Sequence, residues 1–139
     1  QAALAAPDHH RLKPTHFIVV ASEQREAFGE ILVEAMRDLD DIDEQQVERV
    51  RHHPMRAPLL VLAVTRFQDH AKVPDFEQTL STGAAVQNFL LSLQAQGFST
   101  MWRSGAVVES NWFKQKLGLQ TDDLISGIIY IGNAFKSIP

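Results

Sequence analysis

The 139-residue chain contains no cysteine. Its absence excludes disulfide bonds, metal sites built on thiolates and a cysteine nucleophile. A chain without cysteine is compatible with a reducing compartment, and no secretory signal is visible in the sequence. We therefore expect a cytoplasmic protein.

Basic residues are in the minority, and long apolar runs are missing. Thirteen Lys and Arg against seventeen Asp and Glu give a formal net charge of −4. The composition therefore lacks the excess of basic residues that is typical of proteins that bind nucleic acid. No apolar run approaches the ~20 residues that a membrane span needs. With 45% apolar and 22% charged residues, the composition is that of a globular protein, and the length suits one domain. We expect neither a nucleic acid nor a membrane as a partner.

Several catalytic and metal-binding motifs are also absent. The pairs His9-His10 and His52-His53 consist of neighbours whose side chains diverge, and no His-Glu-x-x-His occurs, so surface histidines are a better interpretation than a metal site. The stretch 102–105 (WRSG) lacks the first Gly of a serine-hydrolase elbow. The seven glycines form no phosphate-binding loop. We therefore predict no metal site and no catalytic side chain that acts as a nucleophile.

An acidic cluster lies at residues 38–44 and contains four Asp and one Glu. It could be interpreted as a cation site, but it lacks the Gly and the final Glu of a calcium loop. A solvated loop that caps the next helix is the preferred interpretation.

Apolar periodicity predicts four strands separated by helices. Strands are expected at 15–21, 57–65, 98–103 and 124–131, and helical segments at 1–6, 23–39, 43–52, 75–96 and 109–117. Ser22 is expected to cap the second helical segment, Pro74 to start the longest one and Gly97 to end it. This order predicts an α+β or α/β layered domain, but the pattern does not determine the order of the strands.

The longest helix has a centre with very small side chains, Gly83-Ala84-Ala85. A glycine inside a helix costs about 1 kcal/mol relative to alanine, so it indicates that another backbone or a flat ligand approaches closely, or that a helix packs there. The helix is apolar nearly all round, which favours a homodimer. Arg103, at the end of the following strand, could serve an electron-rich ring or a phosphate, or could pair with a nearby carboxylate.

The helix and the strand after it carry a resemblance to a known family. Residues 80–91 (LSTGAAVQNFLL) and 96–103 (QGFSTMWR) resemble the FMN-dependent nitroreductase family. Further matching stretches are 6–9 (APDH), 13–17 (KPTHF), 70–74 (HAKVP) and 102–106 (WRSGA). The last two resemble in particular the small YdjA-type NAD(P)H nitroreductases, and the matches cover nearly the whole chain in the right order.

The resemblance implies a nitroreductase-like α+β fold. That fold has a mixed, mainly antiparallel sheet of about four strands flanked by helices, in an intertwined homodimer with FMN at the interface. It also implies that NAD(P)H reduces the flavin, which then reduces a nitro compound, a quinone or a similar acceptor. Matched residue by residue, His9, Met101, Trp102 and Arg103 would contact the flavin. The segment from Leu91 to Gln96 would bind the nicotinamide nucleotide.

The chain also departs from the family pattern. We expect residues 1–139 to form a single nitroreductase-like domain without the family's N-terminal Arg-Arg-Ser segment, which holds the FMN phosphate, and without its C-terminal tail. Ala5 stands where a basic residue is expected, and Lys13 and Thr15 replace a Gln and a Trp. A phosphate without its arginines would lose charge-assisted hydrogen bonds. A flavin-binding or flavin-processing member, or a silent dimeric scaffold with weak FMN binding, therefore remains an alternative.

Overall fold

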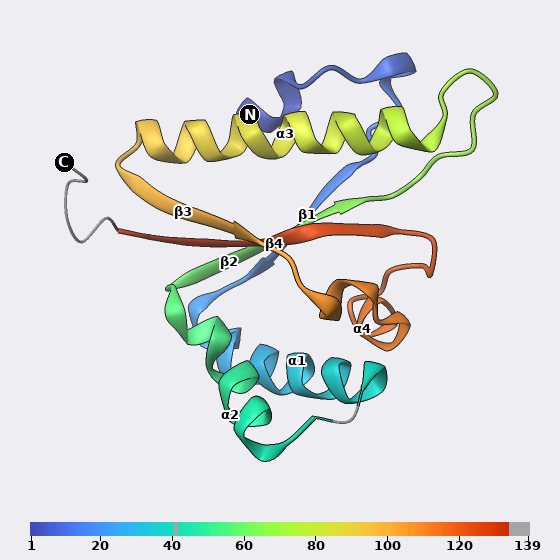
Figure 1. Cartoon of the computed structure of the whole chain (residues 1–139). Coiled ribbons are helices and arrows are strands. Elements are labelled where there is room, and N and C mark those ends of the chain that lie inside the picture. Colours follow the sequence, from blue (N-terminus) through green and yellow to red (C-terminus); the bar gives the residue numbers. More distant parts are fainter. Residues whose placement is uncertain (41, 134–139) are drawn as a thin grey trace.

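The computed structural model describes residues 1–40 and 42–133, and in it four strands form one sheet. The strands are β1 (Thr15–Val20), β2 (Leu59–Thr65), β3 (Phe98–Arg103) and β4 (Leu124–Asn133). They lie in the order β1-β2-β4-β3, and each neighbouring pair is antiparallel (Figure 1). The predicted fold class and the four predicted strands are confirmed, with boundaries that differ by at most two residues.

Helices cover both faces of this sheet. The long helix α3 (Asp75–Ala95) lies along one face, and the N-terminal segment runs beside it (Figure 1). The opposite face carries α1 (Arg25–Leu39), α2 (Glu44–His52) and α4 (Asn111–Lys116). In the described part of the chain, no helix is both long and apolar enough to cross a membrane.

Strand β2 shows why the core has two halves. Successive side chains of a strand point to opposite faces, so a fully apolar strand feeds both layers. Leu60, Leu62 and Val64 join the larger cluster on the α1 side, whereas Val61 and Ala63 pack with Val86 of α3. The apolar run of β2 is thus explained by burial on both faces.

Most of the predicted helix ends are confirmed. Pro74 precedes α3, and Gly97 follows it with a φ of +87°, a conformation that favours glycine. Asp43 caps α2 by accepting a hydrogen bond from the backbone N–H of Gln46 at 2.8 Å. The predicted 109–117 helix corresponds to α4 (Asn111–Lys116), and a 3₁₀ turn, Ala106–Glu109, precedes it.

The prediction that Ser22 caps a helix is wrong. Its hydroxyl donates a hydrogen bond to the carbonyl of Pro58 at 2.6 Å and so ties the end of β1 to the start of β2. Residues Ser22–Gln24 form a 3₁₀ turn, and α1 begins only at Arg25. The side chain of Gln24 supplies the local cap by accepting from the N–H of Ala21 at 2.9 Å.

The close approach expected at Gly83 is not made by any described part of this chain. A Cβ atom built on Gly83 would have no atom within 4 Å. The helical glycine that does admit a neighbour is Gly29 of α1, where a Cβ would collide with the backbone carbonyl of Arg51 in α2. Whether a second copy or a ligand approaches Gly83 stays a prediction.

Candidate active site

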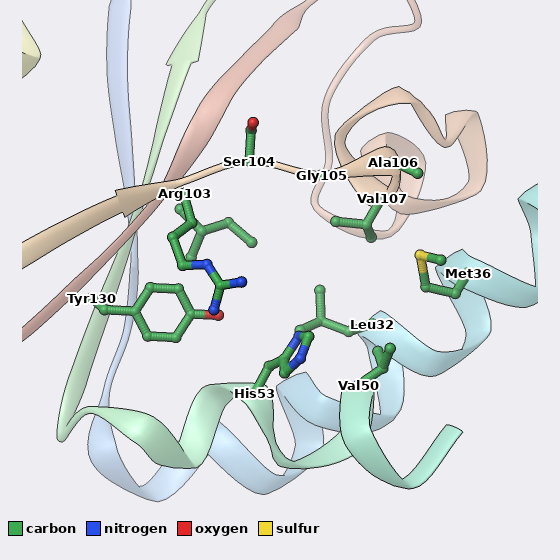
Figure 2. A pocket seen from close by; sticks show the side chains of 11 residues that line it. Leu32, Met36, Val50, His53, Arg103, Ser104, Gly105, Ala106, Val107 and Tyr130 are labelled. Atoms are coloured by element: carbon green, nitrogen blue, oxygen red, sulfur yellow. The ribbon is translucent and has the colours of Figure 1, made fainter. Parts of the chain in front are cut away.

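A small hollow opens where β3 leaves the sheet, on the face that carries α1 and α2. Its volume is about 250 Å³. Most of its lining side chains are apolar. Besides Ser104, three are polar: Arg103 at the end of β3, His53 after α2, and Tyr130 of β4 (Figure 2). The apolar walls come from Leu32, Met36, Val50, Val107 and Ile128. We call this space the apolar hollow.

The three polar side chains give the apolar hollow one polar end. Figure 2 shows Arg103, Tyr130 and His53 turned toward that end, whereas Ser104 points away from it. The guanidinium carbon of Arg103 lies 6.0 Å from the centre of the Tyr130 ring. Among the described residues, Arg103 forms no ion pair with a carboxylate. No described carboxylate therefore compensates the positive charge of Arg103 in the hollow.

The neighbouring groups stay neutral near pH 7. Burial lowers the pKa of His53 below its ordinary value, and the positive charges of Arg56, Arg103 and Arg49 lower it further. Burial raises the pKa of the Tyr130 hydroxyl, against the opposing effect of Arg103 and Arg56. Arg103 thus supplies a permanent charge, while His53 and Tyr130 supply neutral hydrogen-bonding groups.

A second hollow of about 520 Å³ adjoins the first and shares Arg103 and Tyr130 with it. Its other polar side chains include Arg56, Ser99 and Asn133, and no Asp or Glu lines it. We call it the basic hollow. Together the two spaces suit a ligand with a flat, largely apolar ring and an anionic extension.

Trp102 fixes the end of β3 from the other face of the sheet. Its indole N–H donates to the carbonyl of Ser126 at 3.1 Å. The indole lies over Gly127, whose φ is +150°, and a Cβ at Gly127 would also lie 2.6 Å from the carbonyl oxygen of Arg103. Only a glycine at position 127 leaves room for the Trp102 indole. The indole in turn holds the strand end that carries Arg103.

One chain does not gather all the residues that were predicted for the site. Arg103 lines both hollows, and Met101 lines the basic one. His9 lies at the N-terminal end of α3, where its Nδ1 is 2.6 Å from a carboxylate oxygen of Glu77. Leu91 and Gln96 lie at the other end of α3, and the Gln96 amide donates to the Ser92 carbonyl at 2.9 Å.

Sequence reasoning missed three residues that the fold brings to Arg103: His53, Arg56 and Tyr130. His53 was considered only as half of an adjacent histidine pair. Tyr130 offered a usable signal, since it is the only tyrosine of the chain and stands inside an apolar strand. Arg56 offered none beyond its position just before β2.

A larger hollow of about 730 Å³ lies between the N-terminal segment and α3. Arg11, Lys13, Asp8 and His16 line it together with small and apolar residues, but it contains none of the predicted strand residues 101–103. In the described part of the chain, no three His, Asp or Glu side chains come together in a way that could hold a metal ion. The Arg103 region remains the better candidate site.

Comparisons with known proteins agree with the earlier resemblance. The sequence model of the nitroreductase family matches residues 1–133. The chain is 36% identical over 132 residues to "Putative NAD(P)H nitroreductase YdjA" of Escherichia coli, which covers 95% of this chain and 72% of that protein. It is 33% identical over 137 residues to "Putative NAD(P)H nitroreductase" of Haemophilus influenzae, with 98% and 74% covered.

Solved structures share the fold. A nitroreductase-like family protein from Bacillus cereus has a TM-score of 0.79 at 24% identity, over 99% of this chain and 72% of the other. The FMN-dependent nitroreductase NfnB from Mycobacterium smegmatis, solved in complex with NADPH, has a TM-score of 0.69 at 16% identity, over 96% and 74%. At these sequence identities, the two structures show that the fold is shared and nothing further.

Proposed function

Because the chain belongs to the nitroreductase family and is therefore an oxidoreductase, we propose that it uses FMN and NAD(P)H to reduce nitro compounds, quinones or similar acceptors. The observation that carries the cofactor assignment is the Arg103 guanidinium at the polar end of the apolar hollow, where it pairs with no carboxylate of the described residues. Relatives named as NAD(P)H nitroreductases support the nicotinamide donor. The FMN named for the solved NfnB supports the flavin.

The residues around the apolar hollow fit a flavin ring. Isoalloxazine is flat, with an apolar dimethylbenzene end and a polar pyrimidine end, and the hollow has apolar walls and one polar end. When bound, FMN would supply hydride transfer from a nicotinamide nucleotide to an acceptor. Among the described residues that line the hollow there is no Asp or Glu, and its one serine, Ser104, points away from it.

Each polar residue would have a distinct part. Arg103 would hold a fixed positive charge beside the pyrimidine end and so favour added negative charge on the ring. The neutral Tyr130 hydroxyl would offer a hydrogen bond without adding charge. The walls formed by Leu32, Val50 and Val107 would keep water away from the ring, which strengthens the electrostatic effect of Arg103.

We further propose that the active form is a homodimer. His9, Leu91 and Gln96 lie with α3, on the face of the sheet opposite the apolar hollow. A second copy could bring this face against the Arg103 region, which is what the family resemblance implies. Exposed apolar side chains on α3, with Leu80 at 67% and Leu91 at 53% exposure, support such an interface.

The proposal is tested on the purified protein after incubation with FMN and removal of free flavin. We expect retained visible flavin absorbance, and steady consumption of NADH or NADPH when a nitroaromatic or a quinone is added. Bound flavin without any consumption would favour a flavin-binding or flavin-processing protein. A protein that retains no flavin would contradict the proposal and favour the silent scaffold.

A further inference from the structure

Three arginines lie around the two hollows of a chain that is acidic as a whole. Arg49, Arg56 and Arg103 each lie close enough to His53 to act on its charge, and the last two also act on Tyr130. None of the three forms an ion pair with a carboxylate of the described residues. In a protein with a formal net charge of −4, the described residues here form a local excess of positive charge.

Two of these arginines share the basic hollow. Arg56 comes from the 3₁₀ turn (His53–Arg56) before β2, and Arg103 comes from the end of β3. Two guanidinium groups in one hollow repel each other, and an anion bound beside both would relieve that repulsion. A guanidinium presents two parallel N–H donors that match the two oxygens of a carboxylate. Ser99 and Asn133 add a hydroxyl and an amide donor, so the polar side chains of this hollow suit a carboxylate.

The remaining walls of the basic hollow suit a flat ring. Met101 and Tyr130 present a thioether and a phenol ring, and Ala57 and Pro58 add apolar surface. Thioether sulfur and aromatic rings both make favourable contacts with a further aromatic ring. The volume of about 520 Å³ is also within the range that small ligands occupy. The side chains together therefore favour an aromatic carboxylate over an aliphatic one.

The position of the basic hollow relates this ligand to the reaction. Because the hollow shares Arg103 and Tyr130 with the apolar hollow, a ligand bound there lies next to the place of electron transfer. We propose that the basic hollow binds the carboxylate of an aromatic electron acceptor, with Arg56 as the residue that determines this specificity. The inference rests on the proposed function, because it takes the acceptor of that reaction as the ligand. It narrows the preferred acceptors to those that carry a negative charge.

Two acceptors that differ in charge but hardly in shape test the role of Arg56. They are para-nitrobenzoate, which carries a carboxylate, and para-nitrobenzamide, which carries a neutral amide at the same position. Both are titrated calorimetrically into the purified protein after incubation with FMN, without NAD(P)H, so that neither compound is consumed. The wild type should bind para-nitrobenzoate about fivefold or more tightly than para-nitrobenzamide, because only the carboxylate forms charge-assisted hydrogen bonds.

Arg56→Gln should weaken para-nitrobenzoate binding about fivefold or more and change para-nitrobenzamide binding by less than about twofold. The Arg56 side chain is exposed, so its replacement should leave the fold intact. Arg49→Gln is the matched control, since it removes the same charge from a residue that lines neither hollow. It should weaken para-nitrobenzoate binding by less than about twofold. In steady-state assays, Arg56→Gln should raise KM for para-nitrobenzoate and leave kcat unchanged.

The outcomes separate the carboxylate site from the proposed function. If NAD(P)H is consumed but Arg56→Gln weakens the binding of both compounds equally, or of neither, the carboxylate site is overturned and the proposed function stands. If no acceptor is reduced, the titrations still decide. Binding of para-nitrobenzoate that Arg56→Gln weakens and Arg56→Lys partly restores would then support the carboxylate site although the proposed function had failed. A wild type that does not bind para-nitrobenzoate would overturn the carboxylate site whatever the activity.

Discussion

Arg103 is a residue whose contributions to ligand binding and to folding can be measured separately. Its guanidinium has no carboxylate partner among the described residues, and its described ring contact is to Tyr130 at 6.0 Å. An exposed cation–π contact of this kind is worth about 0.5–1 kcal/mol. A bond from Arg103 to an anionic ligand would be worth about 1.5–3 kcal/mol.

We predict that Arg103→Ala lowers the reduction potential of the bound flavin by about 30–65 mV, because 30 mV corresponds to about 1.4 kcal/mol. The loss arises if Arg103 stabilises the reduced, more negative flavin more than the oxidised one. A redox titration and a thermal melt on the same preparation check this. A lowered melting temperature with an unchanged potential would assign Arg103 to the fold instead.

His53 should make stability depend on pH in a defined direction. Burial and three arginines lower its pKa in the folded state, so the folded protein prefers the neutral imidazole. This contribution is fully present above the unfolded pKa of about 6.5 and is lost as the pH falls below it. We predict that His53→Gln, which cannot be protonated, is less destabilised by acid than the wild type.

Urea unfolding of both proteins between about pH 5 and about pH 8 measures this difference. The other five histidines are present in both proteins, so their contributions cancel in the comparison. The stability difference between the two proteins should shift in favour of His53→Gln as the pH falls below about 6.5. If the free energies of unfolding of the two proteins changed in parallel with pH, protonation of His53 would not destabilise the folded protein.

The elements of this fold differ in how strongly the sequence specifies them. Strands β1, β2 and β4 were predictable because each is a short apolar run bounded by polar residues or proline, whereas β3 is more polar and follows the glycine that ends α3. The strand order was not, because β2 pairs with β4 through contacts between residues far apart in sequence. The position of Arg103 at a strand end was also predictable. Its encounter with His53 and Tyr130 was not, since it depends on that same long-range pairing and on the packing of α2.

The two helical glycines show where local reasoning fails. Both cost helix propensity, but the sequence does not tell which one faces a neighbour. The structure places a backbone carbonyl of α2 against Gly29 and open space beside Gly83. Within the described chain the close helix contact lies at Gly29, which the sequence did not single out, whereas a contact of Gly83 with a second copy or a ligand stays a prediction.

We predict opposite effects for the same substitution at these two glycines. Gly29→Ala should force α1 and α2 apart and cost about 1–3 kcal/mol. Gly83→Ala should have no effect or stabilise by up to about 1 kcal/mol, because alanine is the better helix former. Urea unfolding of the two variants at one protein concentration checks the pair. A stable Gly29→Ala protein would show that the α1–α2 approach is looser than the structure has it.

At the scale of the whole molecule, one face of α3 is left exposed by the part of the chain that the structure describes. Phe76, Leu80 and Leu91 follow one another at helical spacing and are 63%, 67% and 53% exposed. Gly83 lies on the same side and offers room for a close neighbour. The predicted site residues His9, Leu91 and Gln96 belong to this same layer. A second copy on this face would bury these exposed apolar side chains of α3. It would also bring the predicted site residues of this layer to the Arg103 region of the partner.

We therefore predict a homodimer at micromolar concentration, with an interface above roughly 2,000 Å². Leu80→Glu should dissociate it in analytical ultracentrifugation, because a carboxylate without a partner would be buried at the interface. Leu39→Glu, which alters an exposed leucine at the end of α1, is the control and should leave the dimer intact.

Gly83→Leu tests whether the partner copy lies close to Gly83. If the partner approaches Gly83, the bulkier side chain weakens the dimer, and if it does not, the dimer persists with an unchanged dissociation constant. A well-folded wild-type monomer at micromolar concentration would contradict the dimer, and the scattered positions of His9, Leu91 and Gln96 would then exclude them from a common site with Arg103.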